Sequence, residues 1–404
     1  MVYVTTRPRN LGVLGVTIGF GIFAALSSGP ASAMPAFARR EDLACGTCHQ
    51  AHYPRLNAFG RQYQENGYQL PDGADSPVRA RADTPAGLAS SVPVSVRGQV
   101  FALAPVDASD EDTSSLQMSL GSYVMGGGTI APNVSYVFSG SLFPTPMLHH
   151  AHVGVNNVFA DKLGQGTLNL RAGSLFLMDF GRPGHRDLFP SPAVSMTTAV
   201  GRNTFNLDEA NLGVQVYGRP NFGPFHYEVA VVAGDMAGKP DRDDGKDVFA
   251  RTSVTLFQHT DHELNGALFG YRGRSDIITT TDNLVLAQRD VFWLAGGDAE
   301  LDLGRVDING LFYVSRHSDA ELDGAPAQFE AWRGECVLAL TPKWSGSVRY
   351  EGVASADLPE LGAQQLSAHA AFAAAPNALV LAGWRQDLSS FSKSSAVVAL
   401  DVAF

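Results

Sequence analysis

The residues best suited to chemistry form a short motif near the N-terminus. Positions 45–49 read Cys-Gly-Thr-Cys-His, the C-x-x-C-H pattern that is typical of c-type haem attachment. Two thiols one helical turn apart can each bond to a haem vinyl group, and the adjoining imidazole then lies beneath the iron. The motif therefore predicts a covalently bound haem whose iron is the reactive centre.

Two other chemistries use the same cysteine spacing. A structural zinc site needs a second pair of ligands, whereas the remaining cysteine, Cys336, stands alone far downstream. A thioredoxin-like redox pair needs a βαβ setting, and no such pattern surrounds the motif. Haem attachment is the interpretation that fits, and Cys336 is expected to be a small buried or lipid-facing apolar residue.

The first residues have the pattern of an export signal. Arg7 and Arg9 precede an apolar run over 11–26, and small residues at 31–33 suit a signal peptidase, with cleavage after Ala33. The alternative is a membrane anchor, but four glycines interrupt the run and it is short for a spanning helix. We therefore predict a signal peptide over 1–33, in agreement with haem attachment outside the cytoplasm.

One amphipathic helix is expected after the motif. Leu56, Phe59 and Tyr63 recur at helical spacing. Pro54 suits a first helical position, and Gly67 suits the left-handed residue that ends a helix. The helix should have about three turns, and its apolar stripe would lie against a porphyrin face or pack in an ordinary core.

The haem-bearing segment, predicted over 34–72, is short. Arg61 on its helix suits a haem propionate, and equally a solvated position. A linker rich in Ala, Asp, Pro and Arg follows over 73–92. Because about 40 residues are too few to bury a porphyrin unaided, we expect the segment to fold into the structure formed by the rest of the chain.

The rest of the chain alternates apolar and polar residues with a period of two. In one stretch Val306, Ile308 and Phe312 alternate with Asp307 and Asn309. Segments of about ten such residues, separated by turn residues, are the signature of a transmembrane β-barrel, with apolar faces toward lipid and polar faces toward a lumen. Alternation alone does not decide this, since a soluble barrel has its apolar face inside.

Three further features favour an all-β transmembrane antiparallel barrel over 93–404. The chain ends in an alternating strand that closes on Phe404, which resembles the assembly signal of bacterial outer-membrane barrels. Short turns alternate with longer connections, as periplasmic turns and outer loops do in porins. About sixteen strands can be counted, an even number that leaves both barrel ends on the periplasmic side. They lie near 93–104, 115–126, 131–143, 147–159, 167–178, 210–219, 224–235, 248–258, 263–273, 290–302, 305–317, 329–341, 344–354, 364–375, 378–388 and 394–404.

Composition agrees with this class. The chain has 17% charged residues, 42 glycines and a formal net charge of -11, which argues against nucleic acid as a partner. No phosphate-binding glycine motif and no Ser-His-Asp or Cys-His arrangement is evident.

The N-terminal segment together with such a barrel resembles the fused monohaem cytochrome-porins, a family that includes the outer-membrane Fe(II) oxidases of iron-oxidising bacteria. The resemblance implies Cys45 and Cys48 as thioether links, His49 as the proximal iron ligand, oxidation of extracellular Fe(II), and electron transfer to periplasmic cytochrome c. Besides the 45–49 motif it rests on Pro35, Ala36, Phe37, Ala38, Arg39, Pro54, Leu56, Asn57, Phe59, Gly60, Arg61, Gly67 and Tyr68.

The motif does not define the sixth ligand of the iron. Strand parity places His150 and His152 on a polar, lumen-facing side, with His149 on the opposite side. Met125 also falls on a polar face. The two lumen-facing histidines are the predicted distal candidates, and structural or solvated roles remain open for them.

Three functions follow from these features. The leading hypothesis is an outer-membrane electron conduit, with a haem segment as lumen plug, that oxidises extracellular Fe(II) or takes electrons from another donor. The second is a solute-conducting porin whose haem segment is a structural or sensing plug. The third is a redox module that docks to separate cytochromes and sends electrons outward. Each is compatible with a monomer or with a homo-oligomer in outer-membrane lipid.

Overall fold

The structure is a computed structural model of the whole chain. The residues it describes are 4–6, 37, 41, 43, 45–49, 55–70, 94–105, 116–143, 146–180, 193–236, 245–259, 262–281, 284–321, 324–375, 377–389 and 394–403. The predicted linker over 73–92 and nearly all of the predicted signal peptide lie outside them.

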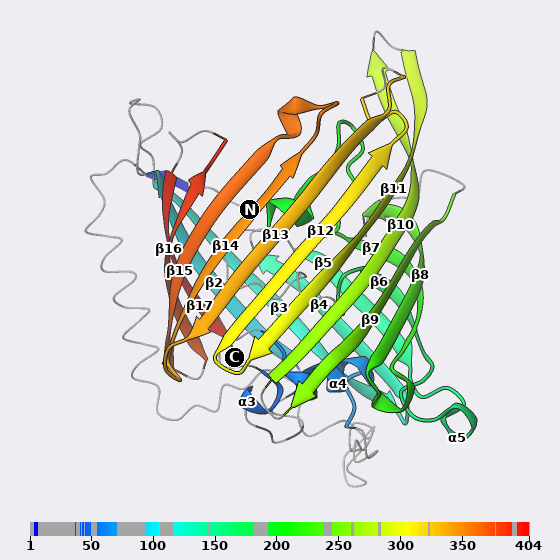
Figure 1. Cartoon of the computed structure of the whole chain (residues 1–404), viewed down its shortest axis with the longest axis vertical. Coiled ribbons are helices and arrows are strands. Elements are labelled where there is room, and N and C mark those ends of the chain that lie inside the picture. Colours follow the sequence, from blue (N-terminus) through cyan, green and yellow to red (C-terminus); the bar gives the residue numbers. More distant parts are fainter. Residues whose placement is uncertain are drawn as a thin grey trace.

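Within the described residues, sixteen antiparallel strands form a closed barrel (Figure 1). Each strand pairs with the next along the chain, and closure comes from the pairing of the last strand with the first. The strands are β2 (Val94–Pro105), β3 (Leu116–Ala131), β4 (Val134–Phe143), β5 (Met147–Val155), β6 (Asn169–Phe176), β7 (Ala210–Gly218), β8 (Phe225–Met236), β9 (Asp247–His259), β10 (His262–Thr281), β11 (Leu284–Leu303), β12 (Val306–His317), β13 (Ala327–Ala339), β14 (Trp344–Ala354), β15 (Ala363–Ala375), β16 (Ala378–Asp387) and β17 (Ser394–Ala403).

A short additional strand, β1 (Val4–Thr6), pairs with the beginning of β3. It lies within the predicted signal peptide, whose cleavage stays a prediction. Among the described residues, no helix is both long and apolar enough to span a membrane.

Side-chain direction in the barrel wall follows the predicted alternation. On β12, Ile308 and Phe312 are 45% and 50% exposed on the outer surface, whereas Asp307 and Asn309 are buried toward the interior. The wall therefore has an apolar outer surface, as a transmembrane barrel requires. Cys336 is exposed on β13, as the lipid-facing alternative predicted.

The strand order agrees with the prediction, but several bounds differ. The predicted strand 131–143 starts too early, because β3 extends to Ala131 and β4 begins at Val134, after a turn in which Asn133 has φ +60°. The predicted strand 147–159 ends too late, because β5 ends at Val155. The predicted strands 263–273 and 290–302 are too short, since β10 and β11 each have 20 residues. Their distal halves pair only with each other among the described strands and extend beyond the rim (Figure 1), where no lipid face imposes alternation.

The interior is not polar throughout, which corrects the simple expectation of a polar lumen. The described residues between β6 and β7, 177–180 and 193–209, contribute buried side chains to the interior and include the short helix α6 (Val194–Thr197). Their apolar side chains pack on apolar residues that β8–β14 direct into the lumen, so this part of the lumen is filled by an apolar core. The cluster contains Leu177, Met178, Met196, Val200, Leu207, Phe249, Phe269, Tyr271, Phe292, Leu294, Leu311, Tyr313, Phe329 and Val353.

Three of the described helices lie at the end of the barrel where the short turns are (Figure 1). They are α3 (Cys45–Cys48), α4 (Ala58–Glu65) and α5 (Ala160–Leu163). The predicted helix starts too early, because Asn57 has extended backbone angles and its side-chain oxygen accepts the N–H of Gly60 at 2.9 Å, which is an N-cap. Its end is as expected, with Gly67 at φ +71°.

Candidate functional site

The C-x-x-C-H motif forms one helical turn. Cys45 and Cys48 are the first and last residues of α3, and His49 follows directly. Nδ1 of His49 donates to the carbonyl oxygen of Arg55 at 3.2 Å. A hydrogen bond at Nδ1 fixes the imidazole tautomer that has Nε2 as its electron-pair donor, which is how iron-ligating histidines are commonly oriented.

The chain returns closely against this turn. The backbone N–H of Asn57 donates to the carbonyl oxygen of Cys48 at 2.9 Å, and its side-chain amide donates to that of Thr47 at 3.0 Å. A Cβ placed on Gly60 would lie 2.1 Å from the carbonyl oxygen of Cys48. Glycine at position 60 therefore allows α4 to touch the end of α3.

We expect Gly60→Ala to disturb the motif. Alanine would favour the helix by up to about 1 kcal/mol, but a backbone carbonyl would have to move, and such overpacking costs about 1–3 kcal/mol. The segment should become more sensitive to limited proteolysis, and less haem should be attached, than in the matched variant Ala58→Gly, which lowers the helix propensity at the start of α4 but creates no close contact. Equal attachment in both variants would contradict the tight packing of Gly60.

Ion pairs join this segment to the barrel wall in three places. Arg55 pairs with Asp307 of β12 and Glu335 of β13. Arg61 pairs with Glu263 at the start of β10. Glu65 accepts from Arg219, which follows β7, at 2.9 Å.

These partners are buried, so their charges matter more than charges on a surface would. Burial alone would raise the pKa of the Glu65 carboxyl, but interactions with His226 and with the permanently charged Arg219 hold that pKa below its usual value. Burial would lower the pKa of Arg61, but the carboxylates of Glu300 and Glu263 raise it. Both groups are therefore charged at neutral pH.

The ion pair of Arg61 bears on its predicted role. The guanidinium binds Glu263 and also donates to the carbonyl oxygen of Leu56 at 3.1 Å. The structure thus gives Arg61 a wall partner in addition to the haem propionate predicted for it. The propionate contact stays a prediction.

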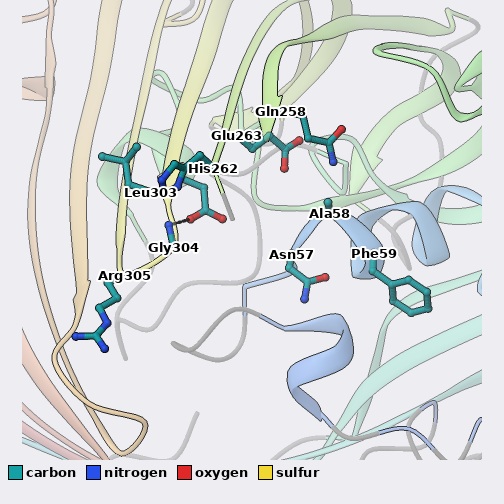
Figure 2. Close-up of a pocket in the computed structure, with 10 residues that line it drawn as sticks. Asn57, Ala58, Phe59, Gln258, His262, Glu263, Leu303, Gly304 and Arg305 are labelled. Atoms are coloured by element: carbon teal, nitrogen blue, oxygen red, sulfur yellow. Dashed lines mark hydrogen bonds between the residues drawn. The ribbon is translucent and has the colours of Figure 1, made fainter. Parts of the chain in front are cut away.

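A cavity of about 600 Å³ lies between α4 and the short turns (Figure 2). It is bounded on one side by Asn57, Ala58 and Phe59, and on the other by the ends of strands β9–β12. A second cavity of about 420 Å³ adjoins it and shares Ala58, Phe59, Gln258 and Glu263. The face of α4 that carries Phe59 therefore borders open space at this end of the barrel.

The two predicted distal candidates do share the inner face of β5. His150 and His152 are both buried there, and Nδ1 of His152 lies 3.0 Å from Nε2 of His150, so one imidazole donates to the other. The ring of His150 also packs on Phe176 at 4.8 Å. Strand parity was thus confirmed, whereas iron ligation stays a prediction.

A further histidine, which was not predicted from the sequence, lies close to the segment. His226 of β8 is fully buried, and among the described residues neither ring nitrogen has a hydrogen-bond partner. It interacts with Glu65, and the ring of Phe180 lies 5.1 Å away. The same parity argument would have found it, because Phe225 and Val229 face outward while Glu228 faces inward with it.

The donor set fits the predicted haem better than it fits a bare metal ion. Among the described residues, no group of three or more His, Cys, Asp or Glu side chains is arranged to hold a metal. Two cysteines on one turn and a following imidazole with an oriented tautomer suit thioether attachment and axial ligation instead.

Several solved bacterial structures resemble this chain along most of their length, and one of them is described as a porin. An anion-selective porin from Comamonas acidovorans matches 78% of this chain and 99% of its own, with a TM-score of 0.55 and 11% identity. Pseudomonas putida OprB matches 77% and 93%, with a TM-score of 0.53 and 9% identity. Salmonella typhi OmpF in complex with daunomycin matches 77% and 97%, with a TM-score of 0.51 and 9% identity.

No family model and no curated protein matches the chain. At these identities the structural matches show the fold alone, a porin-like sixteen-stranded barrel. This fold is compatible with the solute-conducting porin predicted from the sequence, and the matches give no support for haem or for electron transfer.

Proposed function

We propose that this protein is an outer-membrane electron conduit, in which a covalent haem segment occupies the periplasmic end of a porin-like barrel. Extracellular Fe(II), or another donor, would supply electrons that leave to a periplasmic cytochrome c. The main support for the proposal is the way the C-x-x-C-H turn is held at the barrel. The carbonyl oxygen of Arg55 orients His49, and the side chain of Arg55 forms ion pairs with Asp307 and Glu335 of the barrel wall.

Placement in the outer membrane is supported by the apolar outer surface and by the porin-like fold. Short turns lie on the periplasmic side of such barrels. The segment lies at the short-turn end (Figure 1), so an electron acceptor in the periplasm could approach it. The cavities beside α4 open at this end and give that approach room.

The residues of the chain would hold and orient the cofactor. Cys45 and Cys48 would attach it, His49 would ligate its iron through Nε2, and Arg55, Arg61 and Glu65 would anchor the segment to the wall. When bound, haem c supplies a one-electron couple at its iron, and outer-sphere transfer needs no general acid or base. The apolar cluster near α6 would restrict water and solutes in the lumen.

A solute-conducting porin with a haem-bearing plug is the second candidate. The fold matches favour it, since one matched protein is described as an anion-selective porin. It differs from the conduit in requiring an open aqueous path through the barrel. The apolar cluster, to which β8–β14 and α6 contribute side chains, argues against a wide aqueous path through the barrel.

Two measurements on the purified full-length protein separate these functions. We expect an optical spectrum of c-type haem that changes from oxidised to reduced when Fe(II) is added, and little current through planar bilayers. Large, stable channel currents without reduction by Fe(II) would instead support the porin. Absence of covalent haem would rule out the conduit.

A further inference from the structure

Two arginines flank a tryptophan on the outer surface of the barrel. In the strand register, Arg272 of β10 lies opposite Trp293 of β11, and Trp293 lies opposite Arg316 of β12. All three side chains point outward and are exposed, Trp293 by 43%. They form one row across three neighbouring strands, the outer row.

The outer row lies at the upper limit of an uninterrupted apolar surface. On these three strands, every outward residue between the outer row and the turn residues at the other end is apolar or glycine. They are Leu264, Gly266, Leu268 and Gly270 on β10, then Ala295, Gly297, Ala299, Leu301 and Leu303 on β11, and Val306, Ile308, Gly310, Phe312 and Val314 on β12.

The height of the outer row can be derived from strand geometry. Trp293 is ten residues from Leu303, which corresponds to about 33 Å along the strand and about 25 Å across a membrane at a tilt of about 40°. This equals the thickness of the apolar band of outer-membrane barrels. Trp293 is therefore at the level of the outer aromatic girdle, where indole rings meet lipid headgroups.

Neither guanidinium group binds an acidic side chain of the residues that the structure describes. Among the described residues, neither Arg272 nor Arg316 has an ion pair or a side-chain hydrogen bond. Glu330, which faces outward on β13 opposite Val314, is an acidic neighbour, but the row keeps a net positive charge. Exposed arginines beside lipid are stabilised when an anion in the headgroup layer accepts their hydrogen bonds.

We propose that the outer row binds a phosphate group of an outer-leaflet glycolipid. The Cα atoms of Arg272 and Arg316 are about 10 Å apart, two strand spacings, so both guanidinium groups can reach one phosphate above the indole. The sugar and acyl chains of the lipid would lie on Trp293 and on the apolar surface beneath it. This inference rests on the outer-membrane placement proposed above, but not on haem or electron transfer.

The test is lipid binding to the full-length protein in detergent, measured by native mass spectrometry with lipid A as the probe. We expect the double variant R272Q/R316Q to bind lipid A roughly tenfold or more weakly, because hydrogen bonds to charged groups are lost. The variant R272K/R316K keeps the charges without the planar fork and should give an intermediate affinity. K343Q, which removes an exposed charge at the short-turn end, should bind as the unmodified protein does.

Two controls identify the ligand chemistry. Lipid A from which the phosphates have been removed should bind as weakly as the double variant does. The proposal would be overturned if the unmodified protein bound dephosphorylated lipid A as tightly as intact lipid A. It would also be overturned if R272Q/R316Q bound lipid A as tightly as the unmodified protein does. Full competition by inorganic phosphate alone would indicate an anion site without lipid specificity and would overturn it too. Lipid binding by protein that lacks haem would support this inference while contradicting the conduit, so the two can fail separately.

Discussion

Replacing Cys48 by serine should strongly lower the amount of covalently attached haem, because only Cys45 could still form a thioether bond. A hydroxyl group does not form the thioether bond, and Cys48 ends the α3 turn directly before His49. The barrel should still fold, because its strands pair with each other rather than with α3. The measurement is haem-dependent peroxidase staining of the denatured protein together with its optical spectrum.

Cys336→Ser is the matched control for this experiment. It makes the same change, a thiol to a hydroxyl group, at an exposed position on the outer surface of β13. Haem content should remain that of the unmodified protein. If C48S and C336S had equal haem content, or if the unmodified protein had none, the haem attachment site would be wrong and the conduit with it.

The barrel was predictable because a lipid-facing wall imposes its rule locally. Outward positions in the apolar band are mostly apolar, so the alternation around residues such as Ile308 and Phe312 shows which side chains face outward and how long the strand is, without knowledge of the neighbouring strands. This preference for apolar outward residues applies only as far as the lipid headgroups. Beyond Arg272 and Trp293 no lipid face exists, and the additional length of β10 and β11 was missed for that reason.

The candidate site was predictable only in part. The motif identifies its own chemistry, and parity placed His150 and His152 on the inner face. The partners of the segment were not predictable, because Asp307 and Glu335 are 252 and 280 residues away from Arg55 in the sequence. The apolar filling of the lumen was not predicted either. From the sequence alone, an apolar residue that faces the lumen, such as Phe292, cannot be distinguished from an apolar residue in the core of a soluble protein.

Arg55 is expected to be the most important anchor of the haem segment. Its side chain is 2% exposed, and both carboxylates that it binds are fully buried. Arg55→Met would keep much of the volume but leave buried negative charge uncompensated, which costs about 3–5 kcal/mol. The segment should then be cleaved faster in limited proteolysis, and current through the barrel should rise if the segment blocks it.

A second substitution separates lost attraction from uncompensated charge. Glu335 also pairs with Arg333 at 2.5 Å, and Asp307 also accepts from Asn309 at 3.2 Å. R55M/D307N removes one of the two buried carboxylate charges that Arg55 binds, so it should recover much of the protease resistance. D307N alone should have a smaller effect than R55M, because Arg55 keeps Glu335. No recovery in the double variant would show that the segment depends on the guanidinium itself, and normal resistance of R55M would contradict the role of this ion pair as the anchor.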